Sequence, residues 1–110
     1  LARGLLTGKY IDNKIPEGSR LSRDDKIRGI VNNGSNLAVK AYYDLANEHN
    51  IDPIHMALSF CKERPFMGSV IFGATSIIQL RRILKGLDMK LNSHIKQEIQ
   101  KLYKKFPLTF

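Results

Sequence analysis

The feature that most constrains the fold is one short apolar run, Ser69–Phe72, which ends at Gly73 and lies between two helical patterns. Such a run is typical of a buried parallel strand covered by helices on both faces. No other stretch of the 110 residues reads as a strand. One strand cannot form a sheet, because its backbone groups need neighbours at both edges. The sequence therefore predicts an α/β protein whose sheet is completed by a segment upstream of residue 1.

Four helices are predicted around this run from apolar residues that recur every three or four positions. Asp52 followed by Pro53 is a strong start signal, since Asp caps a helix and Pro is tolerated at its first position. Ser76 and Gln79 have the spacing of a capping box. The predicted helices run from about Asn36 to His49, from Pro53 to a point before Pro65, from Ser76 to about Gly86 and from Ser93 to Lys105.

Residues 1–34 are rich in glycine and polar side chains and predict a long irregular segment, with a short helix as an option within Asp24–Val31. Loops of this length in a compact domain are usually functional or mobile. Gly4 and Gly8 permit a close backbone approach, and Lys9 offers a partner for phosphate. A plain glycine-rich surface loop is the simpler interpretation of these residues alone.

The chain has a formal net charge of +8, and most of the excess lies in residues 51–110. These basic residues fall on the polar faces of two predicted helices. Binding of single-stranded nucleic acid requires aromatic rings on which the bases stack, and no such rings are interleaved with the basic residues. A solvated surface therefore explains them better than nucleic-acid binding. No apolar stretch approaches the ~18 residues of a membrane-spanning helix, and no secretory leader is visible, so we expect a cytoplasmic protein.

Metal and disulfide chemistry have little support. Cys61 is the only cysteine, which excludes an internal disulfide, and its place on an apolar helical face favours a core position. His49, His55 and His94 lie on separate predicted elements without the spacing of metal ligands or of a nucleophile and its base.

The junction between the predicted strand and the next helix, residues 71–80, is the most informative stretch. Gly73 at the carboxyl end of a parallel strand lets a ligand approach the backbone, and the helix start that follows favours an anion. Thr75 and Ser76 add hydroxyl groups. A phosphate site and a plain turn with a serine cap both fit these residues.

Three separate motifs together resemble the aldo-keto reductase family. Residues 1–10, followed by 16–20, resemble the segment after the family's seventh strand. Residues 51–60, followed by 64–66, resemble its seventh helix, and residues 70–80 resemble its eighth strand and cofactor loop. The order and spacing of all three are kept over essentially the whole chain.

The resemblance implies an NADP(H)-dependent oxidoreductase acting on a small carbonyl substrate, built on a (β/α)8 barrel of which residues 1–110 form the C-terminal part. It implies that residues 1–34 act as a clasp over the cofactor. The backbone of Leu1, Ala2 and Arg3 would line the pyrophosphate, and Lys9 and Arg20 would meet cofactor phosphates. Gly73, Thr75 and Gln79 would hold the adenosine end and its 2′-phosphate.

Two departures from the family accompany this resemblance. Arg82 and Ile83 stand where the family often has Glu and Asn, and an isoleucine cannot hydrogen-bond adenine. The family's catalytic Asp, Tyr, Lys and His belong to the N-terminal part of the barrel, so we expect no catalytic residue in this chain and no activity from it alone. Two alternatives are a non-enzymatic regulatory protein like the β subunits of potassium channels and, with less support, a small basic nucleic-acid-binding module.

Overall fold

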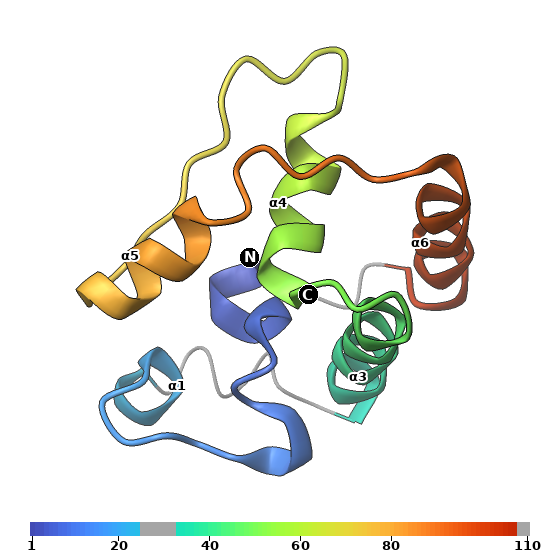
Figure 1. Cartoon of the computed structure of the whole chain (residues 1–110). Coiled ribbons are helices and arrows are strands. Elements are labelled where there is room, and N and C mark those ends of the chain that lie inside the picture. Colours follow the sequence, from blue (N-terminus) through green and yellow to red (C-terminus); the bar gives the residue numbers. More distant parts are fainter. Residues whose placement is uncertain (25–32, 108–110) are drawn as a thin grey trace.

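The computed structural model describes residues 1–24 and 33–107, and these form helices joined by loops (Figure 1). None of the described helices is long and apolar enough to cross a membrane. The elements, in chain order, are the 3₁₀ helices η1 (Ala2–Thr7) and η2 (Ile11–Asn13) and the α-helices α1 (Arg20–Arg23), α3 (Asn33–Glu48), α4 (Pro53–Lys62), α5 (Ile77–Leu84) and α6 (Ser93–Lys105).

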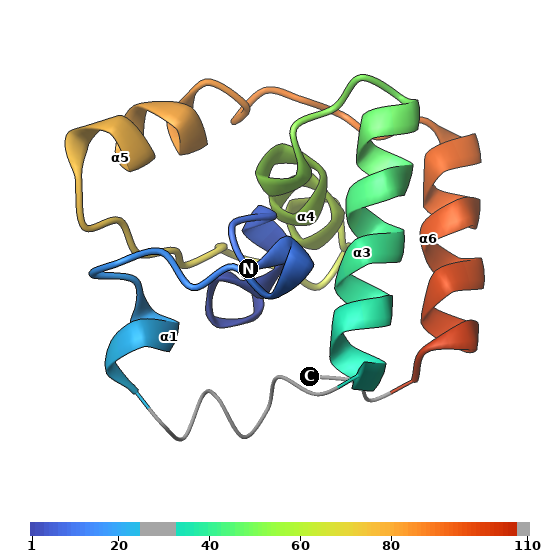
Figure 2. The same ribbon diagram turned by 90° about the horizontal axis from the view of Figure 1, so that it is seen from below.

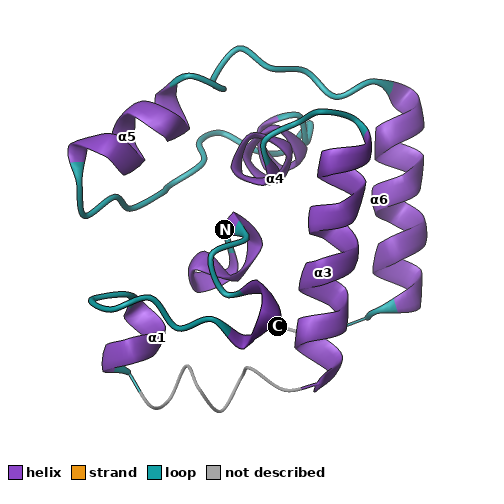
Figure 3. Ribbon diagram, turned by 60° about the horizontal axis from the view of Figure 1, so that its bottom comes forward, coloured by secondary structure: helices purple, strands orange, loops and turns teal. Residues whose placement is uncertain are grey.

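The strand predicted at Ser69–Phe72 is not formed, and the described part of the chain contains no strand (Figure 3). Residues 69–72 instead run as a loop between α4 and α5, and no backbone hydrogen bond joins them to another described segment. The physical reason is that a strand forms only when a neighbouring strand accepts and donates backbone hydrogen bonds. Ile71 is accordingly 93% exposed.

The four predicted helices are confirmed, with start signals where the sequence places them. The Asp52 carboxylate accepts the Ile54 N–H at 2.8 Å and caps α4. The Ser76 hydroxyl accepts the Gln79 N–H at 3.2 Å and caps α5. The Asn92 side chain caps α6, which spans the predicted range, whereas α3 begins three residues before the predicted Asn36.

The main core lies among α3, α4 and α6, and Figures 1 and 2 show α3 and α6 side by side. Ile95 and Ile99 are four residues apart and therefore lie on one face of α6. The buried side chains are Leu45, Ala46, Met56, Leu91, Ile95 and Ile99. Burying such side chains stabilises each helix by about 1.5–3 kcal/mol per large residue, which is why these short helices persist.

Residues 1–24 form a second, smaller unit that packs against α3. The expectation of an irregular segment over residues 1–34 was only partly right, because three short helical turns form, of which α1 begins at a serine cap, Ser19. Leu5, Tyr10, Leu21 and Val39 make a buried cluster that holds this segment together. The short helix considered within Asp24–Val31 lies almost entirely outside the described residues.

Helix α5 is attached to α4 through polar contacts and one buried side chain. Ile83 is 3% exposed, while Ile77 and Ile78 are 69% and 81% exposed. The Asp52 carboxylate binds the Arg82 guanidinium, and His55 Nε2 lies 2.5 Å from the Arg82 carbonyl oxygen. In Figures 2 and 3, α5 and α1 lie on the same side of the molecule, away from α3 and α6.

Candidate functional site

The site lies in a cleft of about 460 Å³ between the N-terminal segment and the loop that leads into α5. This volume lies within the range of ~300–1,000 Å³ that small-molecule pockets occupy. The lining residues are Leu1, Arg3, Gly4, Thr7, Lys9, Gly18, Arg20, Arg23, Ile54, Ile71, Phe72, Gly73, Ala74, Thr75, Gln79, Arg82 and Ile83.

The cleft brings together seven of the eight residues that the sequence singles out, although they are up to 78 positions apart in the chain. These are Leu1, Arg3, Lys9, Arg20, Gly73, Thr75 and Gln79. The eighth, Ala2, lines a different cavity. Two separate sequence regions, each of which reads as a plain loop when taken alone, therefore face a common space.

The lining is strongly basic. Five cationic side chains contribute to it, namely Arg3, Lys9, Arg20, Arg23 and Arg82, and no acidic residue does. Of the four arginines, only Arg82 has a carboxylate partner within the described chain. A concave surface lined by one sign of charge focuses the electric field and attracts ligands of the opposite sign. The cleft is therefore suited to an anion, and an anion with several charges uses it best.

A turn of left-handed backbone presents Arg3 to the cleft. Ala2, Arg3 and Gly4 have φ values of 46°, 56° and 97°, and the Gly4 N–H donates to the Leu1 carbonyl at 2.9 Å. Left-handed φ values at Ala2 and Arg3 are costly for residues with a Cβ, and such costs are tolerated where the surroundings enforce them. Glycine at position 4 also leaves room for Lys9, whose Nζ would lie 3.3 Å from a Cβ there.

Arg20 and Arg23 are placed by a single helical turn. The Ser19 hydroxyl caps α1 by accepting the Ser22 N–H at 3.3 Å, and the buried Tyr10 hydroxyl accepts the Leu21 N–H at 3.3 Å. The two arginines are three residues apart and so share a face. Sequence reasoning missed Arg23. The sequence signal for it was a serine cap, Ser19, followed by two arginines spaced to share one face of a helical turn.

The Tyr10 hydroxyl sits in a polar contact network within the N-terminal segment, which forms one side of the cleft. Burial, the largest influence, raises the pKa of Tyr10. Hydrogen bonds from the Leu21 N–H, from Ser19 and from Lys9 outweigh burial and leave the pKa of Tyr10 below its usual value. Tyr10 therefore serves as an acceptor that ties α1 to the segment that carries Lys9.

Thr75 and Gln79 are bonded to each other across the first turn of α5. Gln79 Oε1 accepts the Thr75 N–H at 3.0 Å and the Thr75 hydroxyl at 3.2 Å. The capping-box prediction is thus half right: the Ser76 hydroxyl accepts the Gln79 N–H, but the Gln79 side chain reaches back to Thr75 instead of Ser76. Gln79 Nε2 has no acceptor in the described chain and is free to donate into the cleft.

Arg82 is held in the cleft wall by Asp52. Arg82 Nε lies 2.6 Å from Asp52 Oδ2, and Arg82 Nη2 lies 3.1 Å from Asp52 Oδ1. Partial burial, the largest influence, raises the pKa of Asp52, but hydrogen bonds from Arg82 and from the Ile54 N–H outweigh it and hold the pKa below its usual value. The carboxylate is therefore charged at neutral pH. Sequence reasoning identified Arg82 but not its anchor.

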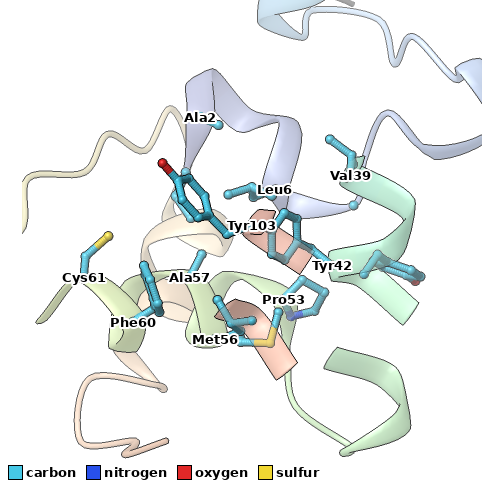
Figure 4. Close-up of a pocket in the computed structure, with 14 residues that line it drawn as sticks. Ala2, Leu6, Val39, Tyr42, Pro53, Met56, Ala57, Phe60, Cys61 and Tyr103 are labelled. Atoms are coloured by element: carbon cyan, nitrogen blue, oxygen red, sulfur yellow. The ribbon is translucent and has the colours of Figure 1, made fainter. Parts of the chain in front are cut away.

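A second cavity of about 300 Å³, drawn in Figure 4, is apolar and lies on the other side of η1. Figure 4 shows Phe60 and Met56 from α4 facing Tyr42 and Tyr103, with Ala2 at the rim and Cys61 at one end. Cys61 is half-buried here, so its predicted core position is only partly right. The few polar atoms in its lining give this cavity no means of holding a charged ligand.

The histidines do not build a metal site. His49 and His94, which the sequence places on separate elements, meet with their ring centroids 5.6 Å apart in an edge-on arrangement. Within residues 1–24 and 33–107, no group of three or more His, Cys, Asp or Glu side chains is placed to hold a metal ion.

Comparison with known proteins agrees with the resemblance read from the motifs. The profile described as "Aldo/keto reductase family" matches residues 1–104. "Protein tas" of Escherichia coli (strain K12) is 34% identical over 103 residues, which cover 94% of this chain and 30% of that protein. "L-glyceraldehyde 3-phosphate reductase" of Escherichia coli O157:H7 is 36% identical over 93 residues, which cover 80% of this chain and 27% of that protein.

A relative with a different description matches at a similar level. "Probable voltage-gated potassium channel subunit beta" of Oryza sativa subsp. japonica is 32% identical over 100 residues, which cover 81% of this chain and 28% of that protein. The chain thus spans less than a third of the length of these relatives. Because the family profile matches nearly the whole chain, the protein belongs to the aldo/keto reductase family, whose fold is the (β/α)8 barrel.

Proposed function

We propose that this chain is the cofactor-binding, C-terminal part of an NADP(H)-dependent aldo-keto reductase that interconverts carbonyl compounds and alcohols in the cytoplasm. The observation that carries the proposal is the convergence of five cationic side chains, without any lining carboxylate, on one cleft. Family membership supplies the reaction class, and the cleft supplies the means to hold its cofactor.

The cleft fits NADP(H) in charge and in donor chemistry. Its pyrophosphate and 2′-phosphate groups are anions, and each calls for N–H donors and positive charge. Arg3 and Lys9 would hold the pyrophosphate beside the backbone of Leu1. Arg20 would reach across from the clasp segment, and Gly73, Thr75 and Gln79 would hold the adenosine end. When bound, the cofactor supplies the hydride.

A further segment of the barrel is part of the proposal. No backbone hydrogen bond joins the loop at residues 69–72 to another described segment, and large apolar side chains in it and before it are open to solvent: Ile71 is 93% and Phe66 is 83% exposed. The apolar cavity behind η1 adds to this uncovered surface. Strands contributed by that segment would cover these surfaces and would carry the catalytic residues.

The second candidate is a regulatory, cofactor-bound protein without turnover. The similarity to channel β subunits of Oryza sativa and Arabidopsis thaliana, at 32% and 31% identity, favours it. The two candidates share the cleft and differ only in the rest of the barrel. Turnover by a complete barrel in which this chain is joined to its own remaining segments would favour the enzyme, and cofactor binding without turnover by the same barrel would favour the regulator.

Calorimetric titration of the 110-residue chain with NADP⁺ tests the proposed function. Loss of one charge-assisted hydrogen bond weakens binding by about 10- to 100-fold, so we expect that loss for Arg20→Ala. Lys104→Ala is the matched control, because Lys104 is also basic and exposed but lies on α6 outside the cleft. Equal effects of the two substitutions, or no saturable binding by the wild type, would refute the proposal.

A further inference from the structure

Arg82 differs from the other arginines of the cleft because a carboxylate from another helix fixes its side chain. Asp52 lies just before α4 and accepts from both Nε and Nη2 of Arg82, which lies on α5. The Asp52 side chain is 23% exposed, whereas that of Arg82 is 47% exposed. The guanidinium therefore has one edge against Asp52 and the remainder open at the cleft wall.

The backbone of Arg82 is held as well. His55 Nε2 lies 2.5 Å from its carbonyl oxygen, and the next residue, Ile83, is buried. An arginine whose backbone and side chain are already fixed loses little conformational freedom when it binds a ligand. Arg82 is therefore preorganised, unlike Arg3, Arg20 and Arg23, which are exposed and have no carboxylate partner in the described chain.

Two donors of α5 face the cleft from neighbouring positions. Arg82 Nη1 has no acceptor among the described residues, since Nε and Nη2 take both oxygens of Asp52. Gln79 lies three residues earlier on the same helical face, and its Nε2 is also available, because its Oε1 is occupied by Thr75. A fixed cationic N–H beside a neutral amide suits a phosphate monoester, whose oxygens accept several hydrogen bonds at once.

We propose that Arg82, positioned by Asp52, selects ligands that carry a phosphate monoester at the α5 end of the cleft. The inference rests on the proposed function, in which that group is the 2′-phosphate that distinguishes NADP(H) from NAD(H). Asp52 is a positioning residue and does not touch the ligand.

The Asp52 role makes a distinctive expectation. If charge alone mattered, removing the Asp52 carboxylate would make the cleft more positive and would tighten the binding of every anion. If Asp52 positions Arg82, removing the Asp52 carboxylate weakens the binding of NADP⁺, which carries the extra phosphate, and leaves the binding of NAD⁺ nearly unchanged. Asp52→Asn is the proper variant, because Asn preserves the cap on the Ile54 N–H.

The experiment measures dissociation constants of NADP⁺ and NAD⁺ for the 110-residue chain and for Arg82→Gln, Asp52→Asn and Glu63→Gln. Glu63 is the matched control: it also pairs with a base, Lys96, and accepts a backbone N–H, but it lies outside the cleft. We expect Arg82→Gln to weaken NADP⁺ by about tenfold or more. NAD⁺ should be nearly unaffected. Asp52→Asn should lower the same selectivity ratio by a smaller factor, and Glu63→Gln should leave it unchanged.

The outcomes separate the two proposals. If the wild-type chain binds neither nucleotide, the proposed function fails and takes this inference with it. If the wild type prefers NADP⁺ but Arg82→Gln weakens both nucleotides equally, or Asp52→Asn tightens NADP⁺, the role of Arg82 is overturned while the proposed function stands. The ratio of the two constants is the decisive quantity, since a general loss of structure lowers both affinities together.

Discussion

Replacing Gly86 with alanine tests how α5 is attached to α4. A Cβ at Gly86 would lie 2.1 Å from Cγ, 2.2 Å from Cδ2 and 2.6 Å from Nδ1 of His55. Carbon atoms pack at about 3.5–4.0 Å, so the ring must move by more than ~1 Å. Because Cγ is the first ring atom, this motion requires another side-chain rotamer, and the contact between His55 and the Arg82 carbonyl is lost.

Overpacking and the lost hydrogen bond together cost about 1–3 kcal/mol. Because Ile83 is the one buried apolar side chain of α5, the substitution lowers the free energy needed to open α5 locally, and amide hydrogen exchange measures that free energy. We expect the Lys85 N–H, bonded to the Arg81 carbonyl at 3.0 Å, to exchange faster in Gly86→Ala. The increase corresponds to about 5- to 150-fold. Gly68→Ala is the control, because a Cβ there meets no atom within 4 Å.

The double variant decides whether the imidazole is the cause. In a His55→Ala background the space beside Gly86 is open, so Gly86→Ala should cost nothing further. Coupling between two residues in contact is expected to be about 0.5–3 kcal/mol. An equal penalty with and without the imidazole would refute the reasoning.

Three other predictions concern the core, the Glu63–Lys96 ion pair and the activity of the chain. Ile95→Ala should remove much of the helical circular dichroism, because Ile95 is 4% exposed in the α3–α4–α6 core and such truncations cost about 2–5 kcal/mol, whereas Ile78→Ala, at 81% exposure, should leave it intact. Hydrogen bonds from Lys96 and from the Leu91 N–H lower the pKa of Glu63. The contribution of Glu63 to stability is therefore complete above its unfolded pKa of about 4.3 and is lost as pH falls through the lower folded pKa. Acid unfolding of Glu63→Gln should lack this loss of stability. The 110-residue chain should not oxidise NADPH with an aldehyde, and turnover by chain free of other reductases would contradict this.

The helices were predictable because their signals are local. Asp52 before Pro53, and Ser76 three residues before Gln79, act within one turn, and the structure contains both caps. The strand at Ser69–Phe72 was not, because a strand depends on backbone partners, and residues 1–24 and 33–107 supply none. Its apolar composition describes what the segment would bury and says nothing about what is present to pair with it.

The candidate site was predictable in its parts and not in its electrostatics. Gly73, in the loop before α5, and Lys9, in the N-terminal segment, indicated phosphate binding in two separate parts of the sequence. Nothing local indicated that Asp52, 30 residues before Arg82, would hold that arginine at the cleft wall. Long-range pairs of this kind depend on how α4 and α5 cross, and sequence periodicity does not contain that angle.

The most direct test of the central claim is where NADP⁺ binds. Two-dimensional NMR of the isotope-labelled 110-residue chain, titrated with NADP⁺, reports each backbone amide separately. We expect saturable shifts at the amides of Arg3, Gly4, Lys9, Gly73 and Thr75, which line the cleft from both sides, and none along the basic outer face of α6. Shifts confined to α6, or spread evenly over all the basic residues, would contradict the assignment of the cleft as the cofactor site.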